Sequence, residues 1–255
     1  MVDERLLSHP DAKKALDDLH DKGLNFDLSR RDQFTLENGW YIDDFRQPLP
    51  PEPPGATPPD GSWEVARQLI RDYEFADPNI IRAVYYPDAP LEKRDMLLEA
   101  KFYGLRFYLG VRIGGVNDET RRVRGRDVRV WGWNYRTLQG HLEMGQMDYE
   151  VWKWQDTGEV EFRIDAFSRP ANIHNPIIKL GFRMFGRRMQ LKFARRACQR
   201  MQRLTRAGLA RQARHEGVRR TSGNLAVAPA SANRPLHDRL ERHRHRGPGD
   251  GWPGE

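Results

Sequence analysis

Residues 98–113 read LEAKFYGLRFYLGVRI, and their pattern decides the fold class. Apolar and charged residues alternate as far as a compact turn at Tyr103 and Gly104. Apolar residues then return at every second position as far as Ile113. A period of two with one apolar face is typical of an antiparallel β-hairpin buried on one side. The stretch therefore predicts an antiparallel sheet.

The chain after this hairpin keeps the same period. It predicts three further strands, at residues 128–135, 147–154 and 160–166. In the first of them Val128 and Val130 point to one side, whereas Trp131 and Trp133 point to the other. Such a change of parity needs either a β-bulge, for which Gly132 is the natural position, or a strand covered on both faces. We expect a strongly bent sheet.

Two helices flank the predicted strands. A short one should begin at Ser62 as its capping residue, and a long one at Asn175 and Pro176, because these residue types favour helix starts. The long helix has basic residues on one side and an apolar stripe on the other, made by Met189, Phe193, Ala194, Ala197, Cys198, Met201 and Leu204. The predicted fold is α+β, a bent antiparallel sheet packed against a long C-terminal helix.

The composition divides the chain into three parts. Residues 1–33 should form an N-terminal segment with a short helix, and residues 34–206 a single α+β domain. Residues 207–255 are basic and poor in large apolar groups, so we expect a disordered tail. Within the domain, residues 48–61 are rich in proline and should be a stiff connector, with a Pro-rich ligand for a partner domain as the lesser alternative.

The net charge of +7 is concentrated in one region. Residues 182–220 contain thirteen Lys and Arg against one acid, Glu216, so this region alone carries +12. A solvated helix face running into a basic tail explains this charge most simply. Peripheral binding to an anionic membrane is a lesser alternative, and nucleic acid is disfavoured because no motif that reads bases or nucleic-acid shape is present.

The cysteine content and the absence of targeting signals favour the cytoplasm. A single cysteine, Cys198, permits no internal disulfide. We find neither a secretion signal nor an apolar run long enough to span a membrane. No Cys/His spacing typical of a metal site occurs, so we expect no metal and no cofactor.

Two motifs resemble those of one protein family. The first is GWNYRTLQGH at residues 132–141, followed by Glu143 and Gly145, and the second is AFSRP at residues 166–170, followed by a basic helix with Gln190. Together they resemble uncharacterised protein family 0548, or domain of unknown function nineteen-ninety, over residues 35–205. Gln146 departs from the family pattern, which has an acid there, and this disfavours paired carboxylates. The resemblance implies no established reaction.

The order of elements is also similar to the helix-grip architecture of START and Bet v 1-like proteins, which hold apolar ligands between sheet and helix. This similarity implies a ligand-binding domain but fixes no function.

His141 and Glu143 are the candidate catalytic residues. A carboxylate beside an imidazole fixes its tautomer and raises its basicity, so the pair would suit a hydrolase or isomerase. Between two glycines, however, a histidine more often closes a turn through a hydrogen bond. The sequence shows no nucleophile or phosphate-binding motif.

A set of aromatic and polar residues could instead line a pocket. In the predicted strand at residues 147–154, Tyr149 lies on one face and Trp152 and Trp154 on the other after a second change of parity. Aromatic residues on both faces cannot all belong to one core, which favours a pocket or a second covered surface. The candidate ligand-binding residues are Trp131, Trp133, Tyr135, Thr137, His141, Tyr149, Ser168, Arg169 and Gln190. The function that we expect is binding of a small apolar or aromatic molecule, without established catalysis.

Overall fold

The computed structural model describes residues 12–102, 105–173, 176–211 and 224–230. Within these ranges the helices are α1 (Ala12–Asp17), the 3-10 helix η1 (Leu28–Gln33), α2 (Ser62–Arg71) and α3 (Pro176–Arg211). The strands are β1 (Tyr41–Leu49), β2 (Ile81–Tyr85), β3 (Asp95–Phe102), β4 (Leu105–Val123), β5 (Arg126–Thr137), β6 (Glu143–Trp154), β7 (Val160–Pro170) and β8 (Ala226–Ala228).

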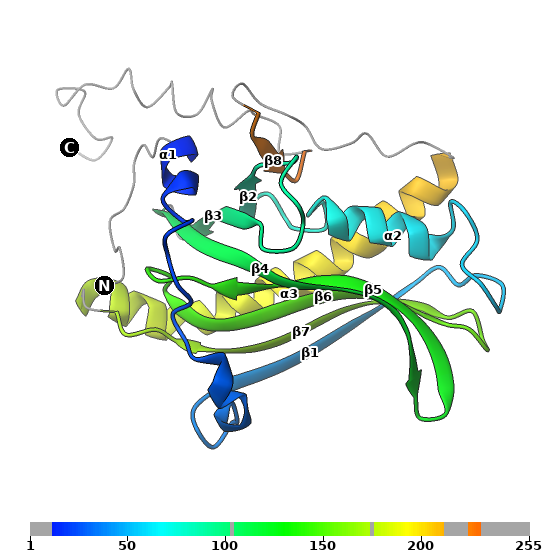
Figure 1. The fold of residues 1–255 in the computed structure, drawn as a ribbon, viewed down its shortest axis with the longest axis horizontal. Coiled ribbons are helices and arrows are strands. Elements are labelled where there is room, and N and C mark those ends of the chain that lie inside the picture. The colour runs from blue at the N-terminus through cyan, green and yellow to red at the C-terminus, as the bar shows by residue number, and fades with distance from the viewer. Residues whose placement is uncertain (1–11, 103–104, 174–175, 212–223, 231–255) are drawn as a thin grey trace.

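The strands form one sheet in the order β1-β7-β6-β5-β4-β3-β2-β8, and every pair of neighbours is antiparallel. The sheet is bent, and α3 runs along its concave side (Figure 1). The predicted α+β class, with a bent antiparallel sheet gripping a long helix, is therefore confirmed. The predicted turn at Tyr103 and Gly104, the cap at Asn175 and a helical turn expected near residues 236–240 lie outside the described residues.

The main core lies between the concave face of the sheet and helices α2 and α3. The apolar stripe of α3 enters it as predicted: Phe193, Ala194, Ala197, Cys198 and Met201 are buried, and Met189 and Leu204 pack against them. Sheet residues that share this face include Trp131, Trp133 and Tyr149. Burial of this apolar stripe holds α3 against the sheet, while the other side of the helix is strongly basic.

The opposite face of the sheet is covered in separate places. Near β2 and β3, helix α1 packs with Leu225 and Val227 in a second apolar cluster. On β5 and β6, a third cluster contains Val128, Val130 and Trp152. The parity change in β5 therefore reflects a strand covered on both faces, which was one of the two explanations offered by the sequence.

The other explanation, a bulge at Gly132, is wrong. Pairing runs unbroken through Gly132 on both sides, to Asn117 and to Glu150. The irregularity lies instead on β4, between Ile113 and Gly115. Gly132 is required for another reason: an added Cβ would lie 2.8 Å from the Glu150 Cα atom, because the neighbouring strand approaches closely there.

The start of α2 also differs from the prediction. Gly61 is the N-cap and Ser62 the first helical residue, without a side-chain capping hydrogen bond. The carboxylate of Glu52 accepts the Trp63 N–H at 2.7 Å instead, and also pairs with buried Lys153 at 2.8 Å. These contacts tie the proline-rich connector to the helix and to the sheet.

Two structured elements fall within the expected tail. Helix α3 continues to Arg211, and residues 226–228 form β8, which pairs with β2 at the edge of the sheet. Strand β1, at the opposite edge, runs into the connector and includes Pro48, as an edge strand tolerates proline. No helix among the described residues has the length and apolar character needed to cross a bilayer.

Candidate functional site

A cavity of about 340 Å³ lies between the sheet and the N-terminal half of α3. This volume is at the lower end of the range for small-molecule pockets, ~300–1,000 Å³. Its wall is mainly apolar. The lining residues are Ile80, Ile81, Leu98, Ala100, Lys101, Phe107, Leu109, Tyr135, His141, Leu142, Glu143, Met147, Gly181, Phe182, Gly186, Met189, Gln190 and Phe193.

The inner faces of β2, β3 and β4 build the apolar wall. Alternation brings Ile81, Leu98 and Leu109 to the same side of the sheet as the core residues, so they face α3. Lys101, which follows Ala100 on β3, also lines the cavity, and its ammonium group donates to the Pro78 carbonyl oxygen at 3.0 Å.

His141 closes the turn between β5 and β6. The ring is buried, and its Nδ1 accepts the backbone N–H of Glu143 at 2.9 Å. Gly140, with φ of 96°, supplies the left-handed backbone that this turn needs. Burial lowers the pKa of His141 to about 4, so the imidazole is neutral near pH 7. Nδ1 also lies 3.1 Å from the Glu143 carbonyl oxygen, to which it would donate in the other tautomer, so both tautomers have a backbone partner in this turn.

Glu143 contacts the His141 ring through the backbone N–H of Glu143, and its carboxyl group has other partners. Burial raises the pKa of the Glu143 carboxyl to about 7, although a hydrogen bond from Gln190 and the charge of Arg187 lower it. The carboxylate that was expected to orient the imidazole is thus directed to α3, and the backbone N–H of the same residue holds the ring. The two candidate catalytic residues lie together at the cavity, but not as a carboxylate–imidazole pair.

Polar contacts to β7 and β1 hold helix α3 in position beside the cavity. Gln190 Nε2 donates to Ser168 Oγ at 2.9 Å, from the helix to β7. Arg187 forms two hydrogen bonds of 2.5 Å with the carboxylate of Asp43 on β1, and its guanidinium lies 4.5 Å from the centroid of the Tyr41 ring. These contacts fix the position of Gln190 at the cavity.

The structure separates the candidate ligand-binding residues into two groups. Tyr135, His141 and Gln190 line the cavity. Ser168 lies behind Gln190, and the Thr137 hydroxyl accepts the Gly145 N–H at 2.9 Å within the turn region. None of these other six predicted residues lines the cavity: besides Ser168 and Thr137, Trp131, Trp133 and Tyr149 belong to the main core, and Arg169 lies 5.4 Å from the centroid of the Trp40 ring.

Sequence reasoning missed most of the apolar wall. It concentrated on aromatic residues of β5 and β6, whereas Leu98 and Leu109 of the predicted hairpin line the cavity. The alternation in residues 98–113 identified these residues as inward-facing. That pattern alone did not distinguish a cavity wall from a filled core.

Residues 27–200 match the model of a family described as Domain of unknown function (DUF1990). The chain belongs to this family. The match confirms the resemblance drawn from the two motifs. No curated protein matches the chain.

The DUF1990 chain is also similar to solved structures. The crystal structure of Ara h 8.0201 has 8% sequence identity and a TM-score of 0.38, with 66% of this chain and 99% of that chain covered. The crystal structure of human STARD10 has 9% identity and a TM-score of 0.32, with 71% and 82% covered.

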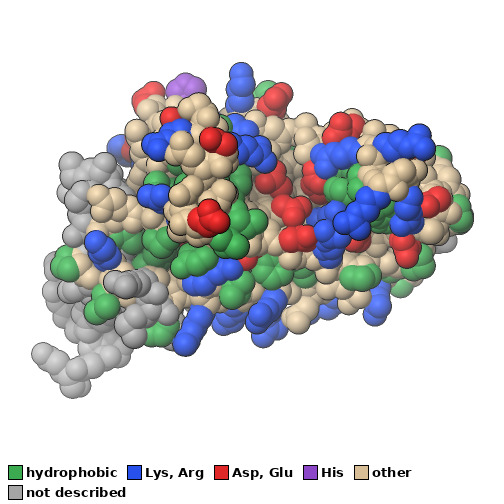
Figure 2. Space-filling view, turned by 90° about the horizontal axis from the view of Figure 1, so that it is seen from below, with side chains coloured by type: hydrophobic (Ala, Val, Ile, Leu, Met, Phe, Trp, Pro, Cys, Tyr) green, Lys and Arg blue, Asp and Glu red, His purple; other side chains and the backbone are tan. Residues whose placement is uncertain are grey.

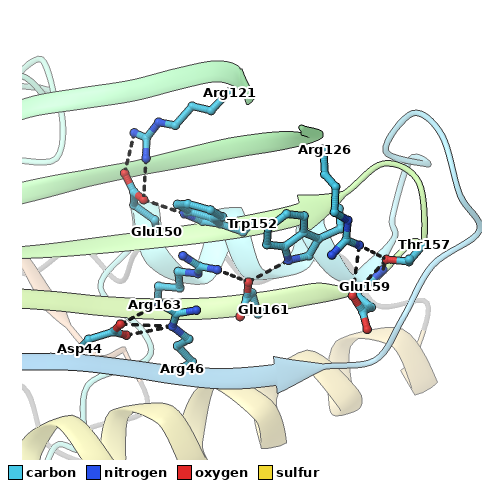
Figure 3. Close-up of polar contacts among 11 residues, drawn as sticks. Asp44, Arg46, Arg121, Arg126, Glu150, Trp152, Thr157, Glu159, Glu161 and Arg163 are labelled. Carbon is cyan, nitrogen blue, oxygen red and sulfur yellow. Dashed lines mark hydrogen bonds and ion pairs between the residues drawn. The ribbon is translucent and has the colours of Figure 1, made fainter. Parts of the chain in front are cut away.

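The convex face of this DUF1990 domain carries a ladder of charges and tryptophans. Figure 2 shows acidic and basic side chains intermixed on this side of the molecule. The guanidinium groups of Arg121 and Arg163 lie 5.6 and 3.4 Å from the centroid of the Trp152 ring, and Arg126 lies 4.2 Å from that of Trp154 (Figure 3). Arginine over an indole ring is a favourable cation–π contact.

Carboxylates complete this ladder. Glu150 pairs with Arg121 at 2.9 Å and accepts the Trp152 indole N–H at 2.6 Å, and Glu161 accepts the Trp154 indole N–H at 2.9 Å (Figure 3). The outward tryptophans are therefore covered by the domain's own charged side chains. They form the second covered surface that the parity change predicted, and they lie outside the cavity.

Two further features of the charged residues concern metal binding and the outer side of α3. Within the ranges that the structure describes, no group of three or more His, Cys, Asp or Glu side chains is placed to hold a metal ion. The outer side of α3 exposes Arg188, Lys192, Arg195, Arg196, Arg203 and Arg206, and the printed sequence of this helix contains no acid.

Proposed function

We propose that this domain binds a small, largely apolar ligand in the cavity between α3 and the sheet. The single observation that supports this function is the cavity of about 340 Å³, walled mainly by apolar side chains and reached by a few polar groups. Transfer of an apolar molecule from water to such a wall is favourable by roughly 25 cal/mol per Å² of apolar surface removed from water.

Filling the cavity tests this function. Ala100 lines the wall on β3, so Ala100→Trp should occupy space that a ligand would need. Val116→Trp is the matched control, because Val116 is exposed on β4. Wild type and the control should bind apolar probes such as decanol in native mass spectrometry and thermal-shift assays, whereas Ala100→Trp should not. Equal binding by all three proteins would rule out this cavity as the site.

Catalysis by the pair at the cavity is the second candidate function. The observation that favours it is the pKa of Glu143, raised by burial to about 7, because a group that titrates near neutral pH can both take up and release a proton. A screen for hydrolase and isomerase activities would be repeated on Glu143→Gln and His141→Ala. An activity retained by both variants would exclude this pair from its mechanism.

A further inference from the structure

The polar groups of the cavity come from the β5–β6 region and α3. Glu143, Tyr135 and Gln190 lie on this side, opposite the apolar wall of β2, β3 and β4. Burial raises the pKa of the Tyr135 phenol to about 12, and the Glu143 carboxyl is close enough for its charge to add to this rise. A bound molecule would therefore meet these polar atoms at one part of its surface and mainly apolar atoms over the rest, where Lys101 is the charged lining residue and its ammonium group donates to the Pro78 carbonyl oxygen.

On this polar side, the Glu143 carboxylate has hydrogen-bond acceptor positions that the described residues do not fill. No ion pair within 4.0 Å involves Glu143 among the described residues. Its side-chain hydrogen bond comes from Gln190, whose amide also donates to Ser168. A carboxylate has about four acceptor positions, so one such hydrogen bond leaves capacity facing the cavity.

We propose that the ligand carries a hydrogen-bond-donating end, an alcohol or a primary amine, that binds the Glu143 carboxylate while its apolar body lies against β2, β3 and β4. This inference rests on the proposed ligand-binding function and specifies the class of ligand. A fatty acid of the same length is disfavoured, because a second carboxylate would be placed beside the first in a site of low polarity.

Three probes with the same alkyl chain test the inference: decanol, decylamine and decanoate. Binding would be measured by displacement of a fluorescent apolar probe at about pH 8.5, where most of the Glu143 carboxyl is ionised. We expect wild type to bind decanol and decylamine roughly tenfold more tightly than decanoate, the difference that one charge-assisted hydrogen bond commonly makes.

Glu143→Gln should lose this preference and bind decanoate more tightly than wild type does. The matched control is Glu37→Gln, which removes the same charge at an exposed position before β1 and should keep the wild-type preference. Circular dichroism would establish that each variant is folded. If Glu143→Gln does not fold, Glu143→Leu replaces it, with the same expected loss of preference.

The outcomes separate the two proposals. Equal affinity for the three probes in wild type, or a preference that persists in Glu143→Gln, overturns the donor-ended ligand and leaves apolar binding intact. If none of the three probes binds to wild type, the proposed function itself fails, and this inference fails with it.

Discussion

His141 has the appearance of a catalytic residue, but its ring also accepts a hydrogen bond from the backbone. Its Nδ1 accepts the Glu143 N–H at 2.9 Å in a buried turn. His141→Ala leaves that donor without its partner, and should lower the free energy of unfolding by about 1–3 kcal/mol. His141→Asn should cost clearly less, because an asparagine oxygen readily accepts the N–H two residues on. Urea denaturation of both variants checks this; equal losses would contradict the turn role.

The same two residues predict opposite dependences of stability on pH. The pKa of His141 is lowered from 6.5 to about 4, so its contribution is present above pH 6.5 and is lost as the pH falls towards 4. The pKa of Glu143 is raised from 4.5 to about 7, so its contribution is present below pH 4.5 and is lost as the pH rises through 7. In wild type the two effects oppose each other over the same interval.

Replacing one of these two residues should therefore reveal the pH dependence of stability that the other one causes. Relative to wild type, Glu143→Gln should become progressively less stable as the pH falls from about 7 to 4.5, and His141→Asn progressively more stable from about 6.5 to 4. The change for His141 is at most about 3 kcal/mol. Denaturation at several pH values measures both. Parallel curves for the three proteins would show that neither burial effect operates.

At the scale of single residues, the sequence identified the important positions more successfully than it identified what their side chains do. Gly140 and His141 were expected to form a turn, and the hydrogen bond to the Glu143 backbone has that character. The raised pKa of Glu143 was not foreseeable, because it results from burial in the folded domain, and the two α3 residues that oppose it, Arg187 and Gln190, lie more than forty positions along the chain.

Among the elements, β5 shows most clearly what a strand pattern determines. Its alternation correctly divided Val128 and Val130 from Trp131 and Trp133. It did not determine which of the two faces was covered by a helix and which by arginine side chains. That choice depends on the positions of α2 and α3 and of Arg121 and Arg163, which are set by the tertiary fold.

Gly132 and Gly115 provide a matched pair on neighbouring strands. A Cβ at Gly132 would overlap the Tyr149 carbonyl oxygen and lie 2.8 Å from the Glu150 Cα, and backbone atoms cannot move aside cheaply. At Gly115 the nearest atom would be Asn134 Nδ2, at 3.7 Å. We expect Gly132→Ala to lower the free energy of unfolding by about 2 kcal/mol or more, and Gly115→Ala to change it by less than about 1 kcal/mol. Similar losses in guanidinium denaturation would refute the close approach.

For the whole molecule, helix α3 combines two surfaces with different roles. Its inner side completes the main core and the cavity, while its outer side carries exposed basic residues without an acid in the helix. The inner role followed from the helical wheel. Whether the outer side is merely solvated or binds an anionic surface stays a prediction, because attraction to such a surface depends on the partner and on salt.

The C-terminal segment contributes to the fold beyond the residues matched by the family model, which end at 200. Leu225 and Val227 are 6% and 7% exposed and pack with α1, β2 and β3. Strand β8 adds its hydrogen bonds to β2, and Glu74 accepts the Ala230 N–H. The low apolar content of residues 207–255 as a whole hid this strand, although residues 225–230 read LAVAPA, a short apolar run that is compatible with a buried strand.

Truncation should therefore have two distinct results. A chain ending at residue 211 loses β8 and both buried side chains, and should be less stable by at least about 3 kcal/mol, since burial of each contributes ~1.5–3 kcal/mol. A chain ending at residue 230 keeps every described contact and should unfold as the full chain does. Thermal and urea unfolding compare them. Equal stability of the two would mean that β8 is dispensable. Any salt-sensitive binding to anionic vesicles that the full chain shows and the chain ending at 230 has lost would belong to residues 231–255, because α3 remains intact there.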